Sequence, residues 1–161
     1  VIDTLVESID LVPTLVERAG GAICEERMEG RSLSPILHQH AANLPDRAFI
    51  VSEIDYGVRG ARTRLGLHPY ECHAWIIRSP YWKYVLHKRF RPQLFDLKND
   101  PMEFHDLGDD PAHATTRAEL HEALFDWQRG LKIRTEVPVD QLNRRGPERD
   151  EGEFGIMIGH W

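Results

Sequence analysis

The stretch Cys72–Leu107, CHAWIIRSPYWKYVLHKRFRPQLFDLKNDPMEFHDL, is the part of the chain that decides its fold. It carries three short runs rich in aromatic and β-branched residues, which suit a pleated, half-buried surface. These runs are Ala74–Ile77, Trp82–Leu86 and Leu94–Leu97. Ser79-Pro80 and the basic segment Lys88–Pro92 separate them, and a proline cannot donate to a strand ladder. The stretch therefore predicts a meander of adjacent strands.

Alternation along the middle run assigns its side chains to two faces of the predicted sheet. Trp82, Tyr84 and Leu86 point one way, while Lys83, Val85 and His87 point the other. We expect the first face to be buried and the second to be at least partly in contact with water.

The segments on either side of the meander complete an α+β fold. Arg47–Tyr56, RAFIVSEIDY, alternates as a strand does. Together the runs predict a four-stranded antiparallel sheet with strands near 47–56, 73–78, 82–87 and 93–97. Residues 57–71, which contain three arginines as well as glycine and proline, are interpreted as a long, mobile, cationic loop.

A C-terminal helix over 111–129 is predicted to back this sheet. Asp110 and Pro111 supply a cap and a first-turn proline, and Gly130 supplies a stop. Its apolar residues fall at i, i+4, i+7 and i+11, in one stripe. They are Leu120, Leu124, Trp127 and Leu131, and we expect Trp127 to be the main anchor.

Two short helices are predicted before the sheet. Asp10 resembles a helix N-cap, Pro13 falls in the first turn, and Gly20-Gly21 ends the helix. The apolar stripe of this helix is Leu11, Val12, Leu15 and Val16. A helix this short and this apolar requires a large partner surface. Ser34 and Pro35 begin the second helix, as cap and first helical residue, and it is predicted to run to about His40.

Several of these segments resemble, in family order, the C-terminal part of sulfatase-type hydrolases of the alkaline phosphatase superfamily. The meander contributes Trp82-Lys-Tyr, then Leu94-Phe-Asp-Leu-x-Asn-Asp-Pro-x-Glu103, then Asp106-Leu, followed by the helix that ends near Trp127. Ser8–Val16, SIDLVPTLV, and Gly30–Leu37, GRSLSPIL, agree with the same family.

Within the superfamily, three stretches are most similar to phosphonate monoester hydrolases. They are Ser52–Tyr56, Arg91–Phe95 and the closing Gly155–Trp161. The resemblance implies that a catalytic α/β domain precedes this region and that the two short helices belong against it. The chain begins at Val1, inside an apolar run, so we expect it to be cut from a longer protein.

The resemblance also implies where the chemistry is carried. The family uses a formylglycine, made from a cysteine in a Cys-x-Pro/Ala-x-Arg setting, on a divalent metal that favours a deprotonated nucleophile. Cys24 is followed by Glu-Glu-Arg-Met and Cys72 by His-Ala-Trp-Ile, and the family's Asp-His/Asn-Gly metal motif is missing. We therefore assign no catalytic residue, metal ligand or cofactor to this chain, and expect the metal and formylglycine in the missing domain.

Length and composition exclude several classes of function. The chain has 161 residues, 41% of them hydrophobic, and a net charge of −6 with both signs interspersed, so we expect no nucleic-acid partner. No apolar run reaches the ~20 residues that span a bilayer, so we expect no membrane partner. Cys24 and Cys72 are too few for a disulfide framework, and we expect free thiols in the cytoplasm.

Three groups of polar residues are candidate sites. Arg59, Arg62 and Arg64 suit an anionic substrate, but a solvated loop that pairs with acidic neighbours is the favoured interpretation, and whether they reach the active site is left open. Glu53 and Asp55 share a strand face and suggest either acid–base work or ion pairs with Arg59, Arg62 or Arg78. The nine histidines are interpreted as structural or exposed rather than as zinc ligands.

These observations predict three regions: 1–45, the helical end of the catalytic domain and a connector; 46–131, the sheet and helix; and 132–161, a charged linker and an apolar tail. The first hypothesis is a subdomain that braces a sulfate, phosphonate or phosphate ester hydrolase, is inactive alone, and forms homo-oligomers through residues 154–161. The alternative is a free-standing binding or oligomerisation module derived from such an enzyme.

Overall fold

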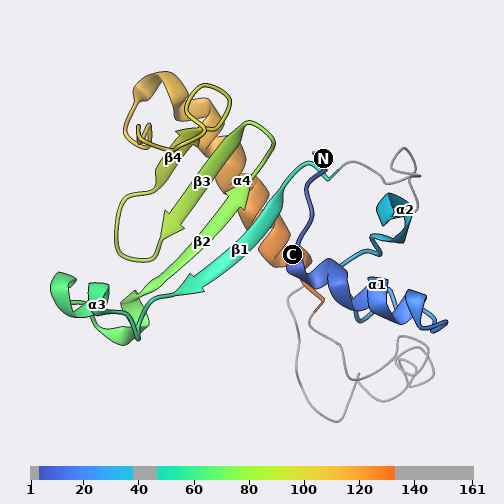
Figure 1. The fold of residues 1–161 in the computed structure, drawn as a ribbon. Helices are drawn as coiled ribbons and strands as arrows, with labels where there is room; N and C mark the ends of the chain where they lie inside the picture. The colour runs from blue at the N-terminus through green and yellow to red at the C-terminus, as the bar shows by residue number, and fades with distance from the viewer. Residues whose placement is uncertain (1–3, 38–46, 133–161) are drawn as a thin grey trace, which may run out of the picture.

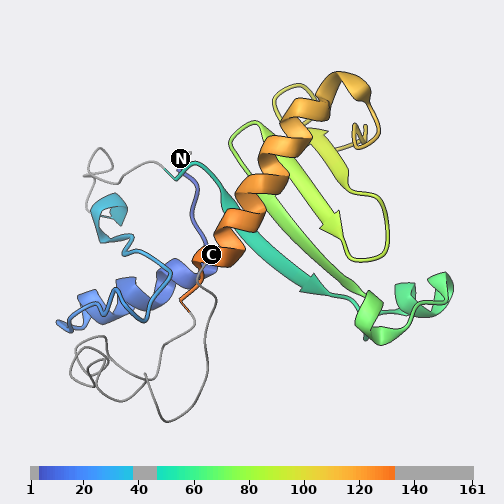
Figure 2. The ribbon, with the colours of Figure 1, turned by 180° about the vertical axis from the view of Figure 1, so that it is seen from behind.

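A computed structural model describes residues 4–37 and 47–132 of the chain (Figure 1). Its elements follow one another as η1 (Ser8–Asp10), α1 (Leu11–Arg18), α2 (Ser34–Leu37), β1 (Ile50–Asp55), α3 (Gly60–Leu65), η3 (Pro69–Glu71), β2 (His73–Arg78), β3 (Trp82–His87), β4 (Gln93–Asp96), η4 (Pro111–His113) and α4 (Ala114–Gly130). The α1 and α2 helices lie to one side of the sheet, and α3 lies beyond the opposite end (Figures 1 and 2).

The predicted antiparallel sheet is confirmed, with strand order β1-β2-β3-β4 and every neighbouring pair antiparallel. The register places Val51 beside Ile77, Ile77 beside Tyr84 and Tyr84 beside Leu94, so one row of side chains crosses all four strands. The first strand is shorter than predicted and begins at Ile50. Arg47 precedes it and pairs with carboxylates of the N-terminal segment instead.

The α4 helix crosses one face of the sheet diagonally (Figures 1 and 2). The core beneath it consists of Ile77, Tyr84, Leu94 and Leu124, all at most 4% exposed. Trp82 and Leu86 pack against this cluster, which confirms the predicted face of β3. Trp127 packs at the edge of the cluster and is only partly buried. The main anchor of the helix is therefore Leu124, not Trp127 as predicted, because Leu124 is the α4 residue that lies within the buried row.

The opposite face of the sheet carries a second, smaller cluster. Ala74, Val85 and Phe95 are buried there, with Ile76 and Leu97 packed against them. Lys83 and His87, also on this face, are half-buried. The face predicted to be partly wet is thus apolar in its middle and polar toward its edges.

Asp10 holds the N-cap position predicted for the first helix, but its side chain makes no capping bond to α1. Its carboxylate accepts instead from the backbone N–H of Glu7 at 2.8 Å, which closes the η1 turn. The second helix, α2, includes Ser34 as its first residue, so Ser34 is not its cap, and the N–H of Ser34 donates to the hydroxyl of Ser32. The predicted end of this helix near His40 lies outside the described residues.

The segment predicted as a long mobile loop contains two short helices instead, α3 and η3. Gly66 ends α3 with a φ of 64°, a left-handed conformation that glycine adopts without steric cost. The ring of His68 accepts the N–H of Tyr70, and the carboxylate of Glu71 accepts the N–H of His68, which holds η3. Local caps therefore order a stretch whose glycines and proline alone predict disorder.

The position of Leu124 in the core leads to a stability prediction. Replacing it with alanine leaves a cavity between α4 and the sheet, and we expect a loss of about 2–5 kcal/mol in the free energy of unfolding. The measurement is urea unfolding followed by circular dichroism. Phe125→Ala is the matched control, because Phe125 is 49% exposed on the same helix. Equal losses for the two variants would contradict the assignment of Leu124 as the anchor.

Candidate functional site

A hollow of about 480 Å³ lies at one end of the sheet, where the strand ends approach α3. Antiparallel pairing brings the end of β1, the start of β2, the end of β3 and the start of β4 to this end of the sheet. The hollow is lined by Tyr56, Leu65, His87, Phe90, Arg91, Gln93 and Asp106. It therefore combines residues that are up to 50 positions apart in the sequence.

A chain of polar contacts holds one wall of the hollow. His87 Nε2 lies 2.9 Å from Gln93 Oε1, and Gln93 Nε2 donates to Asp106 Oδ2 at 3.5 Å. Asp106 also accepts the N–H of Leu94 at 3.1 Å and pairs with Arg91 at 3.0 Å. Burial alone would raise the pKa of Asp106, but the bonds from the N–H groups of Gly108 and Leu94 and the charge of Arg91 hold the pKa below the ordinary value. This carboxylate is committed to fixing the β3–β4 hairpin.

The three arginines singled out in the sequence lie next to the hollow rather than in its wall. Arg59 precedes α3, and Arg62 and Arg64 lie within it, whereas Leu65 is the α3 residue that lines the hollow. Within residues 4–37 and 47–132, none of the three makes an ion pair. Their role in binding an anionic substrate stays a prediction.

Glu53 and Asp55 are exposed and do not form a catalytic pair of buried carboxylates. Asp55 Oδ1 accepts the N–H of Gly57 at 2.7 Å, which closes the turn after β1. Neither carboxylate makes the expected ion pair with an arginine in the described part of the chain.

The described histidines take part in packing and capping contacts. His73 packs on Trp75 with ring centroids 4.4 Å apart, and His113 lies beside Trp82 at 5.3 Å. Tyr84 and His121 are joined by a hydrogen bond of 3.0 Å between the hydroxyl and Nδ1, which links β3 to α4. His38 and His40 lie outside the described residues. Cys72 is buried, Cys24 is half-buried, and both are free thiols.

Within residues 4–37 and 47–132, no three histidine, cysteine or acidic side chains lie together so as to hold a metal ion. The described helices are each too short or too polar to span a bilayer. Cys24 and Cys72 also lack the Cys-x-Pro/Ala-x-Arg setting of the formylglycine that the family resemblance implies.

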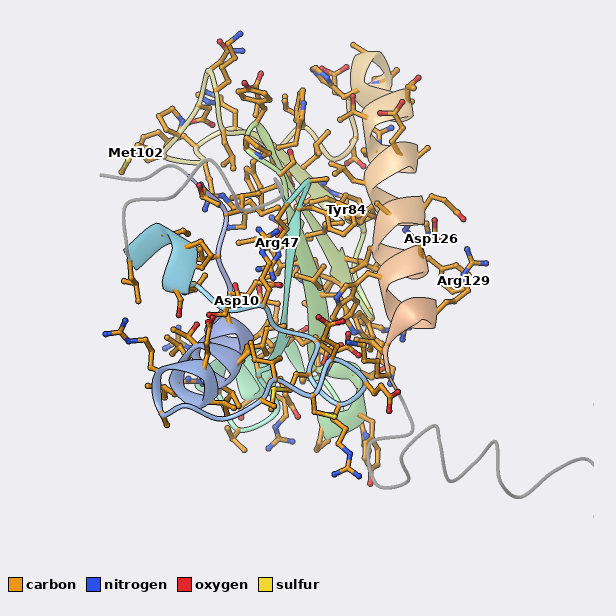
Figure 3. The ribbon with its side chains drawn as sticks, turned by 90° about the vertical axis from the view of Figure 1, so that its right-hand side faces the viewer. Asp10, Arg47, Tyr84, Met102, Asp126 and Arg129 are labelled. Atoms are coloured by element: carbon orange, nitrogen blue, oxygen red, sulfur yellow. The ribbon has the colours of Figure 1, made fainter. Side chains whose placement is uncertain are left out.

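The buried charge of the described structure is a cluster around Asp10, whose side chain is fully buried (Figure 3). Arg47 donates to both of its carboxylate oxygens at 2.8 Å, and the N–H of Arg31 donates at 2.9 Å. Arg47 also pairs with Glu7 at 2.9 Å. Burial would raise the pKa of Asp10, but the bonds from Arg47, Glu7 and Arg31 outweigh it and hold the pKa below 3.8. With every oxygen engaged, this carboxylate joins segments rather than performing catalysis.

This cluster was missed by sequence reasoning. Asp10 and Arg47 are 37 residues apart, and nothing in their spacing marks them as partners. The one available signal is an acidic residue next to an apolar run, which equally indicates a helix cap. The hollow at the end of the sheet was missed for the same reason, because its lining comes from four separate segments.

Comparison with known proteins identifies the family. Residues 1–130 match the family model described as "N-sulphoglucosamine sulphohydrolase, C-terminal". The chain belongs to this family. It is the C-terminal region of a sulfatase-type protein of the alkaline phosphatase superfamily, as the sequence motifs predicted.

The curated relatives and solved structures agree with this membership. The chain is 32% identical over 134 residues to the multifunctional alkaline phosphatase superfamily protein PehA of Trinickia caryophylli, covering 80% of this chain and 25% of PehA. It superposes on the phosphonate monoester hydrolase of Agrobacterium radiobacter with a TM-score of 0.68 at 26% identity, covering 80% of this chain and 26% of that one. The phosphonate monoester hydrolase of Silicibacter pomeroyi gives a TM-score of 0.67 at 29% identity, with coverage of 81% and 26%. The chain thus spans about a quarter of the length of these proteins.

The Asp10 cluster leads to a prediction with a defined pH dependence. Asp10→Asn leaves Arg47 without its buried carboxylate partner, and we expect the free energy of unfolding to fall by about 3–5 kcal/mol at pH 7. The pKa of Asp10 is lowered in the folded state, so its contribution is full well above pH 3.8 and is lost as the pH falls through the folded-state pKa. The difference between wild type and variant should shrink accordingly in acid.

The measurement for Asp10→Asn is urea unfolding at a series of pH values from neutral to acid. Asp109→Asn is the control, because Asp109 is 73% exposed and its ion pair with Arg91 is on the surface, where such pairs contribute about 0–1 kcal/mol. A pH-independent difference for Asp10→Asn would contradict the role of its ionised carboxylate.

Proposed function

We propose that this chain is the C-terminal subdomain of a metal-dependent hydrolase that cleaves sulfate, phosphonate or phosphate esters. In this proposal a catalytic domain precedes it, residues 1–45 complete the edge of that domain, and residues 46–131 brace it from outside. The share of its relatives that the chain covers, about a quarter, supports a larger parent protein.

The observation that carries the proposal is the uncovered apolar face of the first helical segment. Leu11, Val12 and Leu15 are 55%, 55% and 67% exposed, and Ile9 just before them is 45% exposed. Pro13 and Thr14, on the other side of α1, are buried against the rest of the chain. A helix that buries its polar cluster inward and leaves its aliphatic side chains in water requires a partner surface.

The chemistry of the proposed enzyme is assigned to the parent protein, not to this chain. The described residues offer no metal-binding group, and neither cysteine has the setting from which a formylglycine is made. This chain's contribution is structural, because its buried charges are engaged in joining segments. The free-standing module remains the competing function, and the experiments below separate the two.

The first test compares the 161-residue chain with the product of its reading frame extended upstream. Both are purified and assayed on phosphonate, sulfate and phosphate monoesters with Mn²⁺, Ca²⁺ or Zn²⁺. We expect turnover by the longer product and none by the 161-residue chain, because the chain lacks nucleophile and metal motifs. The control is the longer product with its formylglycine cysteine replaced by alanine.

Two outcomes of this assay would contradict the proposal. One is metal-dependent turnover by the pure 161-residue chain that disappears when one of its own residues is replaced. The other is an upstream reading frame without a Cys-x-Pro/Ala-x-Arg motif, which would favour the free-standing module.

We further propose that residues 132–161 form a charged linker and an apolar arm that docks on a neighbouring subunit. Phe154, Ile156, Ile158 and Trp161 supply the apolar side chains, which would be costly to leave in water. Oligomers commonly exchange such arms.

Deleting residues 150–161 tests the arm. We expect the mass measured by light scattering to fall to that of a smaller species, because the subunit contact is removed. The same deletion in the longer product should have the same effect. An unchanged oligomeric state in both proteins would remove the intersubunit role and leave the hydrolase proposal standing.

A further inference from the structure

One end of the sheet concentrates positive charge in a chain whose net charge is −6. We define the cationic end as α3, η3 and the β3–β4 hairpin, which lie together because the strands are antiparallel. Its six cationic residues are Arg59, Arg62, Arg64, Lys88, Arg89 and Arg91. Arg89 pairs with Glu71 at 3.4 Å, which ties the hairpin to η3, and Arg91 pairs with Asp106 and Asp109 at 3.0 Å.

The other four cations of this end make no ion pair within residues 4–37 and 47–132. They are Arg59, Arg62, Arg64 and Lys88. All of them except Arg62, which is half-buried, are exposed. The cationic end therefore carries a surplus of positive charge that a negatively charged partner can offset.

The same end exposes large apolar side chains between the cations. Val58 is 95% exposed, Tyr70 79%, Leu65 53% and Phe90 43%. Leu65 and Phe90 line the hollow of about 480 Å³, so part of this apolar surface is concave. A partner suited to this end must combine carboxylates with adjacent apolar side chains.

The chain itself contains such a segment outside the described residues. Between Glu148 and Glu153 its sequence carries four carboxylates and one arginine, and from Phe154 to Trp161 it carries five large apolar side chains. Acidic residues thus come directly before apolar ones, as a surface of arginines around an apolar hollow requires. From Lys132 to Glu148 are 16 residues, which span up to about 55 Å when extended.

We propose that residues 148–161 of this chain bind the cationic end. The carboxylates of 148–153 lie against Arg59, Arg62 and Arg64, and the apolar residues of 154–161 enter the hollow beside Leu65 and Phe90. This inference rests on the proposed arm, for which it names the receiving surface, and is independent of the hydrolase activity. Because the contact is partly ionic and exposed, it weakens with salt.

The test is photo-crosslinking in the intact 161-residue chain. Ile158 is replaced with p-benzoylphenylalanine, the protein is irradiated at low and at 0.5 M NaCl, and the cross-linked peptides are mapped by mass spectrometry. We expect the adducts to map to 56–71 and 87–93 and their yield to fall at high salt. Mixing ¹⁵N-labelled with unlabelled chains shows whether each adduct lies within one chain or between two.

Charge reversal provides the matched comparison. Arg62→Glu with Arg64→Glu should lower the cross-link yield about fivefold or more, since two of the proposed attractive contacts become repulsive. Arg78→Glu with Lys98→Glu is the control, because it makes the same change in net charge at the opposite end of the sheet and should leave the yield unchanged. Circular dichroism confirms that both variants are folded, and Leu65→Asp tests the hollow separately.

Three results would overturn the inference. The first is adducts confined to α1 or to the middle of the sheet face that α4 does not cover. The second is no adduct at either salt concentration from position 158 or position 154. The third is an equal loss of cross-link yield in the two charge-reversed variants. Adducts at the cationic end that lie only within one chain would uphold the binding surface and contradict the intersubunit arm. Esterase activity of the longer product is measured separately, so failure of the hydrolase proposal is distinguishable.

Discussion

The bidentate pair between Arg47 and the fully buried Asp10 is the interaction on which the arrangement of the chain depends. Moving a carboxylate out of water is costly unless its oxygens are engaged, and here Arg47, Glu7 and Arg31 engage all of them. Because Arg47 lies just before β1, the pair fixes where the helical segment meets the sheet. Gly30 serves the same joint, since an added Cβ would lie 2.1 Å from the carbonyl oxygen of Ile9.

The joint formed by Asp10, Arg47 and Gly30 determines which surfaces of the chain stay uncovered. With the polar cluster turned inward, the aliphatic side chains of α1 face outward, and α4 covers one face of the sheet through Leu124. The end of α4 is tied back to the segment before α2, because Lys132 Nζ donates to the carbonyl of Met28 at 2.7 Å. The chain thus holds itself together while it presents an apolar helix face, the face through which we propose that it docks on a larger domain.

The far end of the sheet differs in character from the joint. The joint is a neutralised, buried ion cluster, whereas the cationic end is exposed and has more arginines and lysines than acidic partners. Exposed charges contribute little to stability but strongly affect which partner is chosen. The buried cluster therefore holds the fold, and the cationic end is the surface that we propose for recognition.

The sequence by itself determined the sheet, the backing helix and the family. Alternation in Trp82–Leu86 and its neighbours sets both the strands and their faces, since a shift by one residue would turn every side chain over. Short Ser-Pro and hairpin connections leave antiparallel pairing as the available solution. These signals are local, and the motifs that carry the family resemblance are local too.

The tertiary structure alone decided the role of Asp10, the order of α3, the anchor of α4 and the hollow at the cationic end. In the sequence Asp10 is indistinguishable from a helix cap, and only the fold brings Arg47 beside it. Leu124 and Trp127 lie on one apolar stripe of α4, and only the packing of α4 on the sheet shows that Leu124 lies in the core. Each of these features depends on residues far apart in the chain. Their proximity follows from packing, which hydrophobic periodicity and local caps do not encode.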